Sequence, residues 1–144
     1  MHSGGVAELP DTSFNSNVIA EFRANGGKVG GPWERMQLLL LHSTGAKSGA
    51  QRINPLGYFD IDGKVIVVGS YAGADINPAW VHNLRAHPRT QIELGSETID
   101  VEARELPDDE RAAAWAQIAA SSPPFAAYQT QTARTIPLFE LTRI

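Results

Sequence analysis

The residues best suited to chemistry lie between Thr44 and Pro55, where the sequence reads TGAKSGAQRINP. Its two glycines allow backbone conformations with positive φ, and Lys47, Ser48 and Arg52 place two cations and a hydroxyl around one turn. With exposed backbone N–H groups, such a turn can hold a phosphate or a carboxylate. Charge-assisted hydrogen bonds of this kind contribute about 1.5–3 kcal/mol each. The alternative is a solvated hairpin whose cations only keep the protein in solution.

A second candidate is the small-residue loop from Gly69 to Ala74, which follows a predicted strand. Small residues allow the backbone to approach a planar ligand closely. Asn77 and Pro78 predict the N-cap and first position of the next helix. Trp80 and Asn83 lie one turn apart on that helix, where the Asn83 amide can point towards the loop. A plain strand-to-helix connection, with Trp80 in the core, is the alternative.

The third candidate is the segment 123–128, in which two prolines precede Phe125 and Tyr128. The two aromatic residues share one face because they are spaced i, i+3. Aromatic pairs at this spacing usually belong to a core. In a short, proline-bounded segment they can equally form a lid over a flat substrate.

Other kinds of site are excluded by residue type or spacing. The chain has no cysteine, which excludes disulfides, thiolate metal sites and cysteine nucleophiles. Ala46 stands where a P-loop requires the glycine before its lysine, and no Gly-x-Ser-x-Gly motif occurs. The four histidines do not have the spacing of metal ligands, so we expect no metal. They are His2, His42, His82 and His87.

Composition places the chain among ordinary globular proteins. Its 144 residues fit one domain, and its formal net charge of -4 is spread along the sequence, so nucleic acid is not an expected partner. No apolar run approaches the roughly 20 residues that span a bilayer. The first fifteen residues lack the apolar segment of a signal peptide, and we expect a cytoplasmic location.

The pattern of apolar residues and turn signals predicts a loosely ordered N-terminal arm, residues 1–14, followed by a single domain, residues 15–144. The first helix is expected to start at a cap formed by Asn15 or Ser16. Strands are predicted at 37–42, 52–59, 65–69, 90–94, 97–105 and 136–141. Asp62-Gly63 and Gly95-Ser96 are hairpin signals. Short antiparallel strands with inserted helices indicate a mainly β fold of the α+β type, a small barrel rather than a doubly wound sheet.

Three stretches of the chain resemble the deazaflavin-dependent nitroreductase family, whose members are small split-barrel enzymes. The matching stretches are LLLLHSTGAKSGAQRINPL, NPAWVHNLRAHP and YQTQTARTIP, in the family's order. The earlier stretch VIAEFRANGGKVGG resembles the branch that reduces quinones and fused coumarin lactones. The resemblance implies an FMN-binding-type split β-barrel.

The resemblance also implies an oxidoreductase that transfers a hydride from reduced coenzyme F420, an 8-hydroxy-5-deazaflavin. Its acceptors would be quinones, conjugated lactones or nitroaromatics. Positions that hold the coenzyme in the family correspond here to Lys47, Ser48, Gly49, Arg52, Asn54, Pro55, Leu56, Ser70, Tyr71, Ala72, Gly73, Ala79, Trp80 and Asn83. The substrate positions are Tyr58, Phe125 and Tyr128. Tyr128 and Ser70 carry hydroxyls that can orient or protonate the acceptor, which makes them the catalytic candidates.

The sequence departs from the family pattern at two places. Ala46 stands where many relatives have an arginine, and Ser122 and Phe125 stand where prodrug-activating relatives have tyrosines. A split-barrel oxidoreductase that uses FMN, whose short tail needs fewer cations, is therefore one alternative. A non-catalytic deazaflavin carrier is another. The expected partner is a small molecule; peripheral membrane contact stays open, as does the choice between a monomer and a homodimer.

Overall fold

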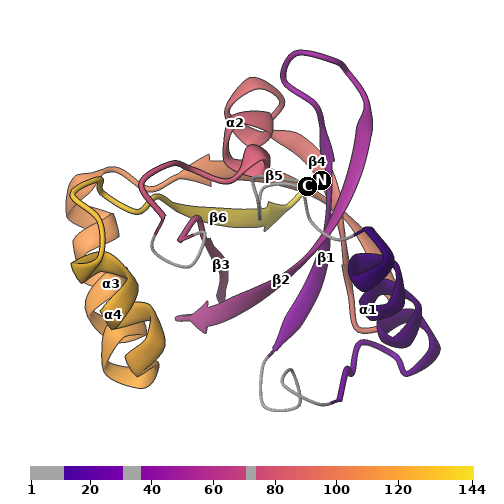
Figure 1. Ribbon diagram of the computed structural model, residues 1–144, viewed down its shortest axis with the longest axis horizontal. Coiled ribbons are helices and arrows are strands. Elements are labelled where there is room, and N and C mark those ends of the chain that lie inside the picture. Colours follow the sequence, from indigo (N-terminus) through magenta and orange to yellow (C-terminus); the bar gives the residue numbers. More distant parts are fainter. Residues whose placement is uncertain (1–11, 31–36, 71–73) are drawn as a thin grey trace.

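The computed structural model describes residues 12–30, 37–70 and 74–144 (Figure 1). In these residues six strands form a closed antiparallel barrel in the order β1-β2-β3-β6-β5-β4. The strands are β1 (Leu38–Thr44), β2 (Gln51–Ile61), β3 (Lys64–Val68), β4 (Arg89–Leu94), β5 (Glu97–Glu105) and β6 (Leu138–Arg143). The prediction of a small barrel with inserted helices is confirmed.

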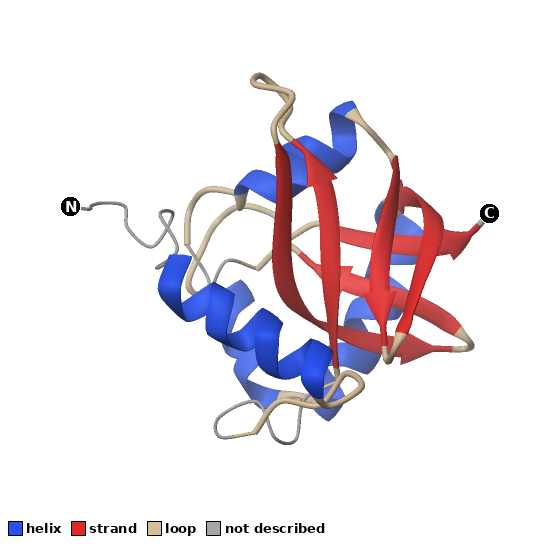
Figure 2. Cartoon of the chain, turned by 90° about the vertical axis from the view of Figure 1, so that its right-hand side faces the viewer, coloured by secondary structure: helices blue, strands red, loops and turns tan. Residues whose placement is uncertain are grey.

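Among the described elements, one helix precedes the strands of the barrel and the other helices are inserted between them. In the described ranges they are α1 (Thr12–Ala24), α2 (Ala79–Ala86), α3 (Asp108–Ser121) and α4 (Pro123–Thr130). α1 lies across the barrel beside β1, whereas α3 and α4 lie together on the opposite side (Figures 1 and 2). α2 lies at the same end of the barrel as the β1–β2 turn.

Most strand boundaries differ from the prediction by one or two residues, and two further differences concern the first helix and the last strand. α1 begins at Thr12, ahead of the expected cap at Asn15 or Ser16, because no glycine or proline between Thr12 and Asn15 stops the helix from extending. The last strand, predicted from residue 136, runs instead from Leu138 to Arg143, in register with β3 and β5. Neither difference moves a candidate site residue.

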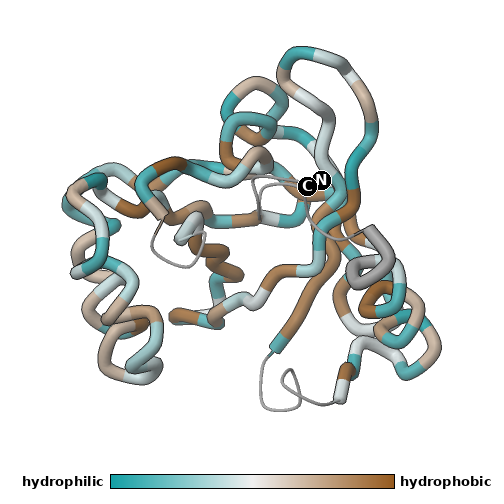
Figure 3. Tube along the Cα trace, viewed as in Figure 1, coloured by the Kyte–Doolittle hydropathy of each residue, from teal (hydrophilic) through white to brown (hydrophobic). Residues whose placement is uncertain are grey.

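The continuous apolar run of β1 is explained by burial on both of its faces. Leu39 and Leu41 point into the barrel and belong to its main core, while Leu38 and Leu40 pack against α1. A strand covered on both sides needs no alternation of apolar and polar residues. Figure 3 shows the resulting hydrophobic colours along β1 and β3.

Both predicted hairpin turns are confirmed. Asp62 and Gly63 have φ angles of 55° and 82°, and the Gly63 N–H donates to Asp60 Oδ1 over 3.0 Å. Gly95 has a φ of 61° between the paired residues Leu94 and Glu97. These left-handed conformations suit glycine and a short polar residue, which is why the two turns could be predicted from sequence.

Among the helices described, none combines the length and hydropathy needed to cross a bilayer. Within the same residues, no group of three or more histidine, aspartate or glutamate side chains is arranged to hold a metal ion.

An ion cluster joins α1 to the barrel wall. Arg23 donates from Nε and Nη2 to the two carboxylate oxygens of Glu93 over 3.0 and 2.6 Å. The Nε2 atom of His42 lies 2.7 Å from Glu93 Oε2. The hydrogen bond from Arg23, with a smaller one from His42, lowers the pKa of Glu93 to about 2. The ionised carboxylate is therefore favoured by folding.

The Glu93→Gln variant should be less stable than the parent at pH 7, by about 1–3 kcal/mol in free energy of unfolding. A carboxylate whose folded pKa is depressed contributes stability above its ordinary pKa and loses it as the pH falls towards the folded value. The difference should therefore shrink between pH 4.5 and about 2. Urea unfolding at several pH values measures it. Glu105→Gln, at an exposed pair with Arg85, is the control and should change stability little.

Candidate functional site

The β1–β2 turn has the hydrogen-bonded geometry of a defined loop. Gly45 N donates to Ala50 O over 2.8 Å, and Gly49 N donates to Gly45 O over 2.9 Å. Gly49 has a φ of 72°, a left-handed conformation that favours glycine. Ala50 N donates to Ser48 Oγ over 3.1 Å, which leaves the Ser48 hydroxyl proton for another acceptor.

The two cations of this turn point into solvent. Lys47 and Arg52 are exposed, and neither forms a salt bridge with any residue that the structure describes. Their neighbours Ser48 and Gly49 are exposed as well. Of the predicted coenzyme-tail residues, Lys47, Ser48 and Gly49 lie on the turn and Arg52 lies at the start of β2, with charge available for an anion.

The turn is tied to α2 by a buried amide. Asn83 is 6% exposed; its Oδ1 accepts from Ala46 N over 2.9 Å, and its Nδ2 donates to Ser43 Oγ over 3.1 Å. Both ends of the side chain are thus bonded to β1 and the turn. Ser43, itself only 1% exposed, was not among the sequence candidates. A serine two positions after four leucines in a buried strand was the only signal for it.

The Asn83→Ala variant should bind the coenzyme less tightly although the substituted side chain is buried. It leaves Ala46 N and Ser43 Oγ without their partner, which costs about 1–3 kcal/mol of stability and loosens the turn. Denaturant unfolding and titration of coenzyme fluorescence measure the two effects. His82→Ala removes an exposed side chain from the same helix and should change neither. Wild-type affinity in Asn83→Ala would contradict the prediction.

The strand β2 presents different residues on its two faces. Leu56 and Tyr58 pack against the barrel core, whereas Ile53 packs against the α1 cluster and Phe59 against the cluster under α3 and α4. By strand alternation Pro55 shares the outer face with Ile53 and Phe59, between the regions that the helices cover. Of the predicted ring-side residues Asn54, Pro55 and Leu56, only Pro55 lies on that face.

Two predicted substrate residues belong to one aromatic cluster. The rings of Phe125 and Tyr128 on α4 have centroids 5.3 Å apart at 73°, and Phe125 meets Phe59 at 5.3 Å and 85°. All three side chains are partly exposed. Phe59, which the sequence analysis did not select, thus joins α4 to the outer face of β2.

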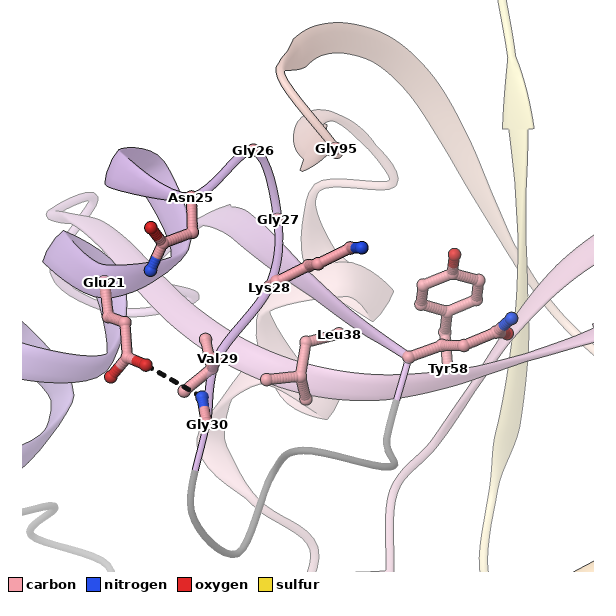
Figure 4. A pocket seen from close by; sticks show the side chains of 11 residues that line it. Glu21, Asn25, Gly26, Gly27, Lys28, Val29, Gly30, Leu38, Tyr58 and Gly95 are labelled. Atoms are coloured by element: carbon pink, nitrogen blue, oxygen red, sulfur yellow. Dashed lines mark hydrogen bonds between the residues drawn. The ribbon is translucent and has the colours of Figure 1, made fainter.

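The third predicted substrate residue, Tyr58, lies elsewhere. It lines a cavity of about 820 Å³ beside the segment between α1 and β1, together with Lys28 and Gly95 (Figure 4). Burial, followed by the charge of Asp60, raises the pKa of its hydroxyl. Since Tyr58 and Phe59 face opposite sides of β2, the structure does not bring Tyr58 together with Phe125.

The loop after β3 begins with a buried polar residue. Ser70 is 7% exposed, and within the described residues its hydroxyl forms no hydrogen bond, while its carbonyl accepts from Arg134 Nη2 over 2.8 Å. Tyr71, Ala72 and Gly73, the next predicted coenzyme residues, lie outside the described residues. A buried serine hydroxyl that has no partner among the described residues is a group that a ligand can satisfy.

The two remaining predicted coenzyme residues, Ala79 and Trp80, lie at the start of α2 and differ in burial. Ala79 is exposed, whereas Trp80 is 6% exposed and belongs to the barrel core. The Trp80 ring lies 5.9 Å from that of Phe139 at 63°. The structure therefore gives Trp80 a packing role; its contact with a coenzyme stays a prediction.

Comparisons with known proteins agree on one family. The family model described as F420H(2)-dependent quinone reductase matches residues 15–143. The F420H(2)-dependent quinone reductase Rv1261c of Mycobacterium tuberculosis is 34% identical over 108 residues, which is 73% of this chain and 72% of that protein.

Two solved structures confirm the split-barrel fold. An F420-H2 dependent reductase, FDR-A, is 38% identical with a TM-score of 0.64 over 72% of this chain and 92% of that one. A structure described as a domain-swapped dimer is 32% identical with a TM-score of 0.67 over 90% of this chain and 96% of that one. Because the family model spans the barrel and every candidate residue, the chain belongs to the F420H(2)-dependent quinone reductase family.

Proposed function

We propose that this protein is an oxidoreductase that uses reduced coenzyme F420 to reduce quinones and similar electron-poor acceptors. The observation that supports it most is the course of β2. The strand begins at the cationic turn and passes the aromatic cluster of α4. From Arg52 to Phe59 it spans about 23 Å at roughly 3.3 Å per residue, a length suited to an elongated coenzyme with a flat ring and an acidic tail.

The described residues fit such a coenzyme at both of its ends. Lys47 and Arg52 would hold the acidic tail, because both cations are exposed and without a salt bridge to any described residue. Ser70 and Pro55 would lie beside the ring, since the Ser70 hydroxyl is buried without a partner in the described chain and Pro55 faces outward.

When bound, the reduced coenzyme supplies the hydride, which is the difficult part of the chemistry. The protein positions the acceptor. Phe125 and Tyr128 offer partly exposed aromatic surface, against which a flat quinone can pack. Holding two reactants in contact replaces a bimolecular encounter with a unimolecular step.

A reduced acceptor also needs a proton. The hydroxyl of Tyr128 on α4 and that of Ser70 in the β3–α2 loop are the side-chain groups proposed to orient the acceptor and donate that proton. Solvent is the other source, because Tyr128 is partly exposed.

Fluorescence titration of the purified chain with coenzyme F420 and separately with FMN tests the cofactor. We expect saturable binding of coenzyme F420 in preference to FMN. Oxidation of the reduced coenzyme in the presence of menadione then tests catalysis. Preferential binding of FMN would overturn the cofactor assignment. Binding without turnover across a panel of quinones would make the protein a carrier instead of an enzyme.

The proposal also covers the range of acceptors, the cellular location and the oligomeric state. Conjugated lactones and nitroaromatics are expected as further acceptors, and a cytoplasmic location remains the prediction made from sequence. A monomer and a homodimer both remain candidates, and light scattering coupled to size exclusion distinguishes them.

A further inference from the structure

Arg134 binds four acceptors in the described parts of the connection between β3 and α2 through one guanidinium group. It lies between α4 and β6 and is partly buried. Its Nη1 donates to Gly69 O over 3.2 Å and to Asn77 Oδ1 over 2.7 Å. Its Nη2 donates to Ser70 O and its Nε to Ala74 O, both over 2.8 Å. All these acceptors belong to the connection 69–77, at both ends of the predicted coenzyme loop.

Only a planar, multiply donating cation can satisfy this set of acceptors. The carbonyls of Gly69, Ser70 and Ala74 accept from three different nitrogens of the group, so removing it would leave three oxygens without this donor. A lysine ammonium is a point charge and cannot reproduce the fork of the guanidinium. Burial lowers the pKa of Arg134, against the opposing charge of Asp75, yet a guanidinium stays charged at neutral pH.

The start of the connection is held by a second, steric constraint. Gly69 N donates to Pro137 O over 2.9 Å. A Cβ atom at Gly69 would lie 2.8 Å from Val81 Cγ2 and 2.9 Å from Pro137 Cγ. The chain therefore leaves β3 through a gap that admits only glycine, and Arg134 binds the carbonyls of Gly69 and Ser70 at the same point.

The end of the connection differs from the sequence prediction. Asn77 was expected to cap α2, but Pro78 occupies the cap position and no side-chain cap is formed. The Asn77 side chain instead accepts the hydrogen bond from Arg134. Arg134 thus binds the residue that directly precedes the cap position of α2.

The backbone of Arg134 is anchored to the aromatic side of the site. Gln129 of α4 donates from Nε2 to Arg134 O over 2.8 Å. Its Oε1 accepts from Ile136 N over 3.2 Å and from Arg111 Nη2 over 2.8 Å. Arg111 Nε also donates to Ile136 O over 2.7 Å. Arg134 is therefore held by the helix that carries Tyr128, while its side chain holds the loop that carries Ser70.

We propose that Arg134 is a positioning residue that sets the β3–α2 connection against α4, and so the coenzyme side of the site against the acceptor side. This inference rests on the proposed function for the meaning of the two sides. The arrangement of the connection in the coenzyme-free chain does not depend on it.

The test compares Arg134→Ala and Arg134→Lys with Arg104→Ala. Arg104 forms exposed ion pairs with Glu110 and Glu140, away from the candidate site, so its removal controls for the loss of an arginine. In Arg134→Ala we expect faster amide hydrogen exchange in residues 69–70 and 74–77 without coenzyme. We also expect coenzyme affinity and kcat with menadione each to fall at least about tenfold. Arg134→Lys should show nearly the same changes as Arg134→Ala. Arg104→Ala should match the parent in exchange, coenzyme affinity and kcat.

Unchanged exchange in a folded Arg134→Ala would overturn the inference, as would parental kcat and affinity. Failure of the parent chain to bind the coenzyme would overturn the proposed function, while the exchange data would still decide whether Arg134 sets the connection. If Arg134→Ala does not fold, Asn77→Ala removes one of the same hydrogen bonds. It should change exchange and kcat in the same direction by a smaller factor, and parental values would contradict the inference.

Discussion

Replacing both Lys47 and Arg52 by alanine should weaken binding of coenzyme F420 by at least about tenfold and up to about a hundredfold. Each cation can form a charge-assisted hydrogen bond worth about 1.5 kcal/mol with an acidic tail, and two such contacts sum to about 3 kcal/mol. Water competes for exposed groups, which sets the lower limit. The folded state should hardly change, because neither side chain forms a salt bridge within the described residues.

A matched double variant separates this local effect from a general change of charge. Lys64→Ala with Arg143→Ala removes the same two charges where β2 and β6 end, around Gly63, at the other end of β2 from the cationic turn. It should leave the affinity within about twofold of the parent, since distant exposed charges are screened over about 8–10 Å. Equal losses in both double variants, or none in the first, would show that the β1–β2 turn is only a hairpin.

The barrel could be predicted because its signals are local. The leucines of β1 show a strand buried on both faces, and Asp62-Gly63 allows few structures other than a tight hairpin. The cationic turn was predictable for the same reason, since Lys47 and Arg52 lie within a few residues of two glycines. Each of these features depends on neighbours in sequence, and each appears in the structure at its predicted place.

The remaining features depend on contacts between distant segments. Asn83 bonds Ser43 and Ala46 across about 40 residues, a pairing that no local pattern encodes. The sequence prediction grouped Tyr58 with Phe125 at the substrate site. Because side chains alternate along a strand, Tyr58 faces the barrel core, and its neighbour Phe59 contacts Phe125 instead. Strand parity can be fixed only once the register with β1 and β3 is known.

Trp80 combines a sequence prediction and a structural finding that one experiment can separate. The Trp80→Ala variant should lose about 3–5 kcal/mol of unfolding free energy, because the indole is 6% exposed and packs edge-on against Phe139 in the main core. Urea unfolding followed by circular dichroism measures this loss without relying on tryptophan fluorescence. Trp115→Ala, at a partly exposed indole under Arg111, should lose less and serves as the control. Equal losses in the two variants would contradict the packing of Trp80.

The Trp80→Phe variant then tests contact with the coenzyme. Phenylalanine keeps an aromatic edge against Phe139 and should cost only about 1–2 kcal/mol of stability, so the variant stays folded. If the buried indole acts only by packing α2 onto the barrel, coenzyme affinity should remain within about twofold of the parent. Packing alone predicts this result, since the helix and its Asn83 contacts are retained. A tenfold loss of affinity in a folded Trp80→Phe would show instead that the indole itself touches the ring.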